Sequence, residues 1–403
     1  MDRPNHQLER RRLLQGSALL GGLNLLGLGG CALPTDRDAA DRRYFEAGPP
    51  LAPVRAEIDR LFDITVCLRP FRAAGPRLDT EQIGNTLVVH NYGHGGSGWS
   101  LSWGSSTIAV QKAMSGSPRD VAVIGCGALG LTSAILAQNA GARVTIYARD
   151  LLPDTRSARA TGSWTPDSRI ALADAAPPGF AALWEQMARI SFKTYRRYLG
   201  LPGNPVEWTD RYFLADPAPD EPATPPRPER LEFAQYIERI RDLTPRARAL
   251  PPGGGPFPAH NVRHTSSMMF NIADYGHTLV NDFLAAGGKF ERREFRAPAD
   301  LTELTETVVI NCPGYGARAL WRDETIIPVR GQIGWLIPQP EVNYGLFYRN
   351  VSMLARRDGI VIQAIEGGDM KGYNDDNEAP NRPESENAVK TIASLFAGPG
   401  STA

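Results

Sequence analysis

Short apolar runs separated by polar, glycine-rich turns indicate the secondary structure in the middle of the chain. Val121–Ile124 is a continuous apolar run of the kind that forms a buried parallel strand. Leu131–Asn139 has the pattern of a helix that stops at Gly141, and Arg143–Tyr147 has the pattern of a second strand. The sequence therefore predicts a strand–helix–strand unit within about 30 residues.

Hydrophobic patterning on both sides of this unit predicts further strands and helices. Two Pro-rich stretches, 216–227 and 250–258, predict long loops, which are either binding loops or surface insertions without a role. The pattern as a whole predicts an α/β protein in which the strand–helix–strand unit is joined by a second, mixed domain. The further segments are residues 63–90, 97–114, 265–294, 307–312, 326–337 and 359–365.

The first thirty residues have the layout of a targeting segment. Arg10–Arg12 precedes an apolar, Gly-rich run, Ser17–Gly30, which ends at Cys31. This layout predicts a signal peptide, because a membrane-spanning helix needs about 20 apolar residues. The arginines resemble a twin-arginine export signal, and Leu28–Cys31 resembles a lipoprotein cleavage box with a lipid anchor at Cys31. We therefore expect an exported protein, in the periplasm or anchored to a membrane; the alternative is a cytoplasmic protein with an incidental apolar N-terminus.

Composition narrows the possible partners. The chain has 403 residues, of which 42% are hydrophobic, enough for a substantial core. Its 44 basic and 44 acidic residues give no charge bias, so nothing favours nucleic acid as a partner. His90 and His94 lie four residues apart, but no third ligand lies near them in the sequence, and the cysteines lack metal-type spacing. We therefore expect no metal site, and Cys67, Cys126 and Cys312 as buried reduced thiols.

A glycine-rich turn joins the first strand of the unit to its helix. Gly125-Cys-Gly-Ala-Leu-Gly130 has the GxGxxG spacing of a dinucleotide-binding loop, and Asp150 ends the next strand about 20 residues on. Gly125 permits the tight turn, Gly127 lets a pyrophosphate approach the backbone, and Gly130 allows close packing. Asp150 can accept a hydrogen bond from a ribose hydroxyl. The sequence predicts a dinucleotide site, but the spacing alone does not separate FAD from NAD.

A second glycine-rich segment carries a family resemblance. His90–Gly104, HNYGHGGSGWSLSWG, resembles the signature near the C-terminus of D-amino-acid and D-aspartate oxidases. Further similarities to this D-amino-acid oxidase family cover most of residues 60–370. Leu68–Arg77 resembles the family's arginine-containing segment. Ala148–Asp150 together with Thr161–Pro166 resembles its flavin-binding turn. Ile310–Ala317 and Arg330–Ile333 resemble its central strands.

The resemblance implies FAD as the cofactor and a known architecture. The expected fold is α/β, an FAD-binding Rossmann-type domain with a second mixed, largely antiparallel β substrate domain. We expect a targeting segment at 1–31, a surface arm at 32–60, an FAD-binding core at 61–170, and at 171–403 a substrate domain mixed with returning segments of the FAD domain.

The order of the motifs departs from that of the family. The HNYGHGG signature and its arginine segment follow the substrate domain in relatives, whereas here both precede GxGxxG. Each motif occurs once, so we interpret the order as a circular permutation in which Ser115–Arg119 joins the former ends. Ala403 and residues 36–63 should then be neighbours. The alternative is a rearranged and inactive gene.

The resemblance also implies the site residues. Arg69 matches the arginine that pairs with the substrate carboxylate, since a guanidinium fork fits a carboxylate; an ion-paired arginine is the alternative. Tyr275 resembles a tyrosine that contacts the same carboxylate, with a core tyrosine as the alternative, and the Gly96 carbonyl would meet the substrate amine. The family's second active-site tyrosine has no clear counterpart, and Ser97 replaces an aromatic residue. The expected cofactor-binding residues are Gly95, Ser97, Gly98, Trp99, Ser100, Gly125, Gly127, Ala128, Leu129, Gly130, Arg149, Asp150, Thr155, Ser157, Thr161, Gly162 and Ser163.

These residues imply oxidation of a small amino acid. A D-amino acid would pass its α-hydrogen to the flavin as hydride, and the imine would hydrolyse to a 2-oxo acid and ammonia. Oxygen, giving hydrogen peroxide, or another acceptor would reoxidise the flavin. The alternatives are a glycine- or sarcosine-type amine oxidase or dehydrogenase, an NAD-linked dehydrogenase, and a non-catalytic exported nucleotide-binding protein.

Overall fold

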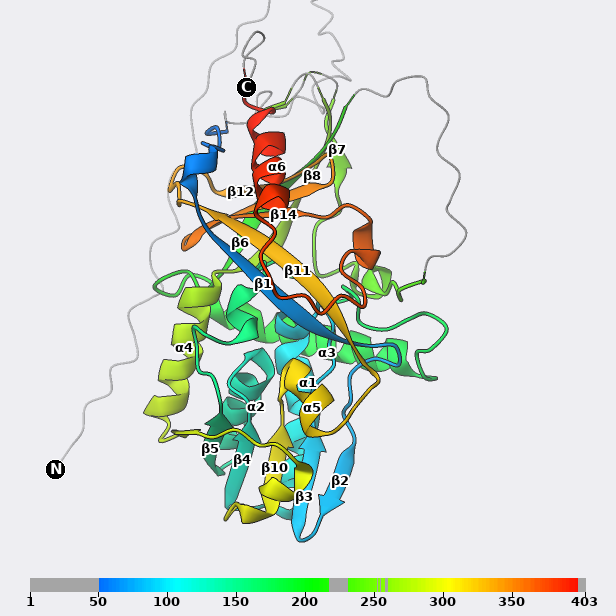
Figure 1. The fold of residues 1–403 in the computed structure, drawn as a ribbon, viewed down its shortest axis with the longest axis vertical. Helices are drawn as coiled ribbons and strands as arrows, with labels where there is room; N and C mark the ends of the chain where they lie inside the picture. Colours follow the sequence, from blue (N-terminus) through cyan, green and yellow to red (C-terminus); the bar gives the residue numbers. More distant parts are fainter. Residues whose placement is uncertain (1–50, 217–230, 252, 254, 258–259, 398–403) are drawn as a thin grey trace, which may run out of the picture. The chain divides into compact units, whose positions relative to one another are not determined.

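Two β-sheets organise the part of the chain described by the computed structural model (Figure 1). The structure describes residues 51–216, 231–251, 253, 255–257 and 260–397, which fall within one compact unit that begins at Ala47. The predicted targeting segment with Cys31 and residues 32–50 of the predicted arm lie outside the described residues, as do 217–227 of the first Pro-rich stretch and 252, 254 and 258 of the second.

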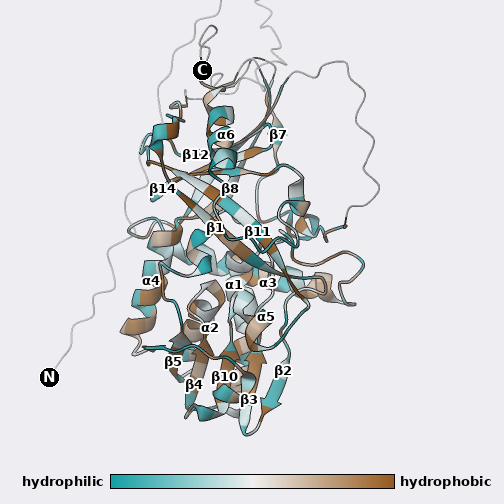
Figure 2. Ribbon diagram, in the orientation of Figure 1, coloured by the Kyte–Doolittle hydropathy of each residue, from teal (hydrophilic) through white to brown (hydrophobic). Residues whose placement is uncertain are grey.

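The smaller sheet has six strands in the order β2-β3-β10-β4-β5-β9. Strand β2, at one edge, is antiparallel to its neighbour β3, and the other five strands run parallel to one another. Strands β4 and β10 are apolar along most of their length and β2 is polar, as Figure 2 shows, because a strand covered on both faces buries every side chain. The strands are β2 (Thr80–Ile83), β3 (Thr86–His90), β4 (Asp120–Ile124), β5 (Arg143–Ala148), β9 (Lys289–Arg292) and β10 (Val308–Asn311).

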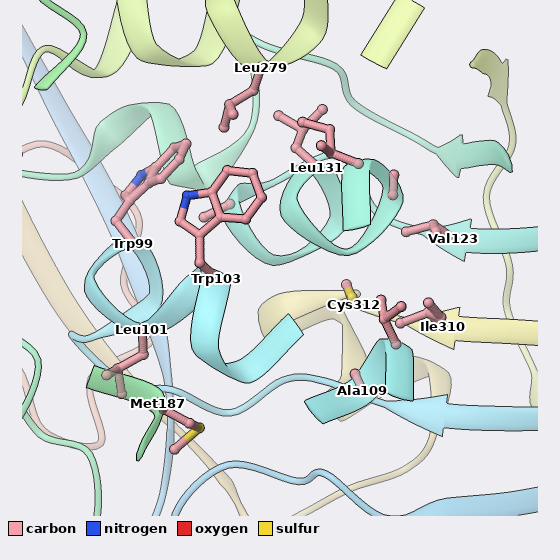
Figure 3. Close-up of a cluster of buried hydrophobic side chains, with 14 of the residues drawn as sticks. Trp99, Leu101, Trp103, Ala109, Val123, Leu131, Met187, Leu279, Ile310 and Cys312 are labelled. Atoms are coloured by element: carbon pink, nitrogen blue, oxygen red, sulfur yellow. The ribbon is translucent and has the colours of Figure 1, made fainter. Parts of the chain in front are cut away.

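Helices cover the smaller sheet and supply its largest hydrophobic cluster. Helix α1 places Trp99 and Trp103 toward Leu131 of α2, while Leu101 lies near Met187 of α3 (Figure 3). The opposite face of the sheet packs against Leu301 and other apolar side chains after β9. The helices are α1 (Gly98–Ala113), α2 (Ala128–Asn139), α3 (Phe180–Tyr195), α4 (Ile272–Ala285) and α5 (Ala317–Leu320).

The larger sheet has eight strands in the order β1-β11-β14-β13-β12-β6-β8-β7, antiparallel except where β12 meets β6. Helix α6 (Arg382–Ala393) covers one face, where Val389 and Ile392 pack on Met353 and Ile362. Together the sheets form the predicted combination of a Rossmann-type unit and a largely antiparallel β domain. The strands are β1 (Leu61–Arg72), β6 (Val206–Ala215), β7 (Arg248–Ala249), β8 (Asn261–Phe270), β11 (Ile326–Leu336), β12 (Tyr344–Tyr348), β13 (Val351–Arg356) and β14 (Gly359–Ala364).

The segment before GxGxxG belongs to both sheets. Strand β1 pairs with β11 from Leu61 to Arg72, and β3 lies between β2 and β10 in the smaller sheet. A 3₁₀ turn at Met114–Gly116 leads from α1 to β4. Val54 and Ala56 share a hydrophobic cluster with α6, so the described ends of the chain pack together. Ala403 and residues 36–50 lie outside the described residues, and the permutation stays a prediction.

Within the described ranges, no helix combines the length and the apolar character that crossing a membrane requires.

Candidate active site

A cavity of about 920 Å³ opens where the carboxyl ends of the parallel strands meet the larger sheet. Its walls include the turns after β4, β5 and β10 and the glycine-rich segment after β3. Ligands bind at this edge of open α/β sheets, and the volume is at the upper end of the range of about 300–1,000 Å³ for small-molecule and cofactor sites. Most of the predicted cofactor-binding residues line this cavity.

The GxGxxG turn forms one end of the cavity. Gly125 has a φ of +94°, and a Cβ atom at Gly130 would lie 1.9 Å from the Gly125 carbonyl oxygen, so both positions need glycine. Ser157 Oγ accepts a hydrogen bond of 3.0 Å from the Ala128 N–H at the start of α2. Gly125, Gly127, Ala128 and Leu129 line the cavity, so the N-terminus of α2 presents backbone N–H groups to an anion there.

Arg149 and Asp150 end β5 beside this turn. Arg149 Nη2 lies 2.8 Å from Asp150 Oδ2, and this hydrogen bond lowers the pKa of the Asp150 carboxyl. Asp150 is therefore ionised at neutral pH and accepts hydrogen bonds, as a ribose hydroxyl requires.

The loop after β5 supplies the next part of the wall. Thr155, Ser157, Thr161, Gly162 and Ser163 all line the cavity. The Thr155 hydroxyl is buried with no hydrogen-bond partner among the described residues, and so is Nδ1 of His94, which also lines the cavity. Buried polar atoms are paired in nearly all proteins, so these two atoms suit a polar ligand in the cavity.

The glycines of the HNYGHGG segment bring its backbone close to the segment Ser168–Arg169. A Cβ atom at Gly95 would lie 1.9 Å from the Arg169 carbonyl oxygen, and the Gly96 N–H donates to the Ser168 carbonyl at 3.0 Å. Gly98, the first residue of α1, has no atom within 4 Å of an added Cβ, so the cavity is open there. Gly95, Gly96, Gly98, Trp99 and Ser100 all line the cavity.

Ser97 and Gly130 do not face the cavity, although both are among the predicted cofactor-binding residues. Ser97 is buried, and its hydroxyl donates to the Ser168 carbonyl at 3.0 Å, because the tight turn before α1 points this side chain toward the loop. Gly130 lies one turn into α2 and packs on Gly125.

The two histidines of the signature hold the segment in place. His90 lies between Glu81 and Asn311, and Nε2 of His94 shares a hydrogen bond of 2.7 Å with the Ser105 hydroxyl. Burial lowers the pKa of His94 to about 3, so the ring is neutral. The described residues contain no group of three or more His, Cys, Asp or Glu side chains that could hold a metal ion.

Arg69 lies on β1, and its side chain lines the cavity. It extends over Gly331 of β11, where a Cβ atom would lie 2.2 Å from Nη1. The next residue, Pro70, accepts a hydrogen bond of 2.7 Å from the Gly95 N–H, so Arg69 and the signature lie side by side. Desolvation lowers the pKa of Arg69, and among the described residues the guanidinium has no ion pair with a carboxylate. A guanidinium without an acid on a cavity wall suits a carboxylate ligand.

Tyr275 lies outside the cavity, contrary to the predicted contact with the substrate. It is fully buried on α4, where its hydroxyl accepts a hydrogen bond of 2.7 Å from Trp103 Nε1 and its ring stacks on Phe270. The apolar face of α4 turns Tyr275 into the core, which is the alternative that the sequence left open.

Residues that the sequence did not single out complete the wall at the Arg69 end. Phe347 and Ser352 come from β12 and β13, Gln363 comes from β14, and Arg169 precedes α3. These side chains carry no local motif: Phe347, Ser352 and Gln363 are placed by strand pairing, and Arg169 lies in the turn region before α3. The hydrophobic patterning of 326–337 and 359–365 indicated further elements there, but not which side chains would face the cavity.

Comparison with known proteins agrees with this geometry. A profile of the FAD dependent oxidoreductase family (DAO) matches residues 120–402. The D-amino-acid oxidase of Dictyostelium discoideum is 29% identical over 215 residues, 52% of this chain and 55% of that protein. The D-amino-acid oxidase of Rubrobacter xylanophilus is 31% identical over 214 residues, 52% of this chain and 57% of that protein. The chain thus matches little more than half the length of these curated relatives.

Two other matches are shorter or more remote. The D-aspartate oxidase of Cryptococcus neoformans is 46% identical over 52 residues, 12% of this chain and 13% of that protein. The crystal structure of glycine oxidase from Geobacillus kaustophilus is 16% identical, with a TM-score of 0.43, and the match covers 63% of this chain and 75% of that one.

The fold and the cavity are those of a dinucleotide-binding protein of the α/β class. The chain belongs to the FAD dependent oxidoreductase family, and its cofactor is FAD. The N-termini of α1 and α2 on the cavity wall and the ionised Asp150 fit this cofactor, as does the Thr155 hydroxyl, which has no partner in the described part of the chain.

Proposed function

We propose that this protein oxidises the Cα–N bond of a small D-amino acid. The observation that carries the proposal is Arg69, a cavity-wall guanidinium that has no carboxylate partner among the described residues and lies beside the Gly95–Gly96 backbone. When bound, FAD supplies the acceptor for the hydride that leaves the substrate Cα. The imine that remains takes up water to give a 2-oxo acid and ammonia, and oxygen takes the two electrons to give hydrogen peroxide.

The residues of the chain position the substrate and exclude other poses. Arg69 binds the α-carboxylate through two N–H donors, and the Gly96 carbonyl accepts a hydrogen bond from the amine. The start of α1 favours negative charge in the cavity, because its free N–H groups carry partial positive charge. His94 is neutral and bonded to Ser105, so it acts as part of the scaffold.

A peroxide-coupled screen of D-amino acids on the flavin-loaded protein tests the activity. We expect turnover of at least one D-amino acid, with Arg69→Ala raising KM about 100-fold and Arg69→Lys, which keeps the charge without the fork, raising it less. An unchanged KM in Arg69→Ala contradicts the assignment of the carboxylate.

The same screen separates the remaining alternatives. Glycine and sarcosine in the panel distinguish a glycine-type enzyme from a D-amino-acid oxidase, and an artificial electron acceptor in place of oxygen distinguishes a dehydrogenase from an oxidase. No turnover with either acceptor, while FAD stays bound, leaves a nucleotide-binding protein without catalysis. The NAD-linked alternative is set aside by the family, which uses FAD.

We further propose that the chain is circularly permuted. The family profile begins at residue 120, yet residues 61–119 supply β1, β3 and α1 to the same two sheets and to the same cavity. A rearranged chain that begins at Asp120 and carries residues 51–119 after residue 397 should fold and bind FAD as this chain does. Loss of FAD binding in that soluble, folded chain contradicts the proposal.

We also propose that the protein is exported, from the twin-arginine pattern at Arg10–Arg12 and the lipobox-like Leu28–Cys31. Fractionation should find it outside the cytoplasm, and Cys31→Ser should release it from the membrane fraction. Cytoplasmic localisation of the full chain contradicts the proposal.

A further inference from the structure

Arg211 on β6 is a buried cation without a counter-charge among the described residues. Its exposed fraction is 4%, and burial lowers its pKa to about 10, so the guanidinium is still charged at neutral pH. Nη1 donates to the Ser163 hydroxyl at 3.1 Å, whereas Nε has no hydrogen-bond partner in the described parts of the chain. Burial of an unpaired charge is costly, so this arrangement calls for an explanation.

Arg356 on β13, a second buried arginine, holds the same loop, residues 160–163, but has an acid beside it. Both guanidinium groups pack 4.9 Å from the centre of an aromatic ring. Arg356 donates to the Ala160 carbonyl at 2.7 Å and forms an ion pair with Asp358. The loop can thus be held by an arginine whose charge is balanced, so support of the loop does not explain the unbalanced charge of Arg211.

Ser163 connects Arg211 to the cavity, next to the start of α1. Ser163 lines the cavity, as does Phe347, whose ring lies against Arg211. Two residues after Ser163, the Thr165 N–H donates to the Ser100 hydroxyl at 2.8 Å and ties this loop to the first turn of α1. Because the Ser163 oxygen accepts from Arg211, the hydrogen of this hydroxyl is free to donate to a group in the cavity.

The first turn of α1 adds positive potential to the same part of the wall. This turn carries no acidic side chain, and the free N–H groups at a helix N-terminus carry partial positive charge. Arg211 and α1 therefore both favour negative charge on a group that is bound beside residues 163–165. The GxGxxG turn, which suits the phosphates, belongs to the smaller sheet, whereas Arg211 lies in the larger sheet.

The flavin ring is the part of FAD that gains negative charge during the reaction. A hydride carries two electrons and one proton, so the neutral oxidised ring gains one negative charge when it accepts a hydride. A cation held in a wall that excludes water stabilises this charge, because the protein screens the Coulomb interaction less than water does.

We propose that Arg211 raises the reduction potential of the flavin, by stabilising the negative charge of the reduced ring through the Ser163 hydroxyl. Arg211 is a positioning residue in this account, since it acts on the cofactor through Ser163 and through its charge. The inference rests on FAD as the cofactor, which the family establishes, and is independent of the amino acid that is oxidised under the proposed function.

A redox titration of the flavin-loaded protein tests the inference without an amino acid. Dithionite is the reductant, a dye of known potential is the indicator, and the flavin absorbance gives the midpoint potential. We expect Arg211→Met to lower this potential by about 30 mV, a tenfold change in the equilibrium between oxidised and reduced flavin for a two-electron couple. Arg211→Lys, which keeps a charge, should lower it less. Arg263→Met, which removes an exposed cation from the neighbouring strand β8, is the control and should leave it unchanged.

Thermal unfolding of the same variants separates this role from a structural one. Because Arg211→Met removes a buried charge without a counter-charge, its Tm should be at or above that of the wild type. An unchanged midpoint potential in the folded, flavin-loaded variant overturns the inference, and a lower Tm beside it would assign Arg211 to the fold alone.

A second variant covers the case in which Arg211→Met does not fold or does not hold FAD. Ser163→Ala keeps the guanidinium and removes the hydroxyl through which it acts, so the midpoint potential should fall by less than in Arg211→Met. An unchanged midpoint potential in Ser163→Ala then overturns the inference.

Turnover of amino acids distinguishes a failure of the inference from a failure of the proposed function. A lower midpoint potential in Arg211→Met, with no turnover of any D-amino acid by the wild type, supports the inference and contradicts the oxidase. Turnover of a D-amino acid, with equal midpoint potentials in the wild type and Arg211→Met, supports the function and overturns the inference.

Discussion

The two ends of the cavity are built in different ways. At the GxGxxG end, the backbone forms the cavity wall. The turn at Gly125–Gly130 and the first N–H groups of α2 lie there in one short stretch of sequence. At the Arg69 end, contacts come from side chains on β1, β12, β13 and β14, which the larger sheet brings together. The first end depends on local geometry, and the second depends on the pairing of distant strands.

This difference separates contacts that any dinucleotide can make from contacts that depend on particular side chains. A backbone cradle recognises phosphates in any dinucleotide, because every chain has N–H groups to offer. Under the proposed function, side chains at the other end select the substrate, and Arg69 and Arg169 line the cavity there. Substitutions at the two ends should therefore impair different properties: binding of the cofactor at the GxGxxG end, and binding of the proposed substrate at the Arg69 end.

The largest effect should come from Gly130→Val at the backbone end. Any Cβ at this position overlaps the Gly125 carbonyl oxygen, so the turn must open and the cradle is lost. We expect the purified protein to lose most of its FAD, measured as the ratio of flavin to protein absorbance. Gly116→Ala, at an exposed glycine with open space around it, is the control. Full flavin content in Gly130→Val would show that the cradle is not the binding site.

An intermediate effect should come from pH, through His94 between the two ends. Burial lowers the pKa of His94 to about 3, whereas an unfolded histidine titrates near about 6.5. Below that value the unfolded chain binds more protons, so this contribution to stability is complete above about pH 6.5 and is lost as the pH falls toward 3. The free energy of unfolding should fall by about 2 kcal/mol between about pH 7 and about pH 5 from this residue.

Urea denaturation at the two pH values measures this loss, and His94→Gln is the reference. The variant should have a pH dependence weaker by the same amount, since its side chain does not titrate. An equal pH dependence in the two proteins contradicts the assignment to His94.

The smallest effect should come from Tyr275→Phe, which tests whether the substrate site extends to Tyr275. The variant removes the hydroxyl that accepts from Trp103 Nε1, so stability should fall by about 1 kcal/mol with KM for the amino acid unchanged. Tyr198→Phe is the control, because the Tyr198 ring packs on Tyr275 and its hydroxyl has no hydrogen bond to any described residue. A large rise in KM for Tyr275→Phe alone would mean that Tyr275 does contact the substrate.

Several features could be predicted from residues close together in the sequence. The strand–helix–strand unit, the GxGxxG turn with Asp150, and the start of α1 at Gly98 all lie where their local patterns indicated. Arg69 followed from its resemblance to a family segment, and the described structure places it on the cavity wall. Tyr275 shows the limit of a short match, because its helix turns the side chain into the core.

The sequence by itself determined the nucleotide-binding unit, since glycine turns and strand periodicity act within a few residues. Only the tertiary structure decided the rest of the site. It paired β1 with β11, and it brought the Pro70 carbonyl to the Gly95 N–H, next to Arg69. Strand pairing and burial depend on residues far apart in the sequence, and no local pattern of a single segment specifies which side chains they bring together.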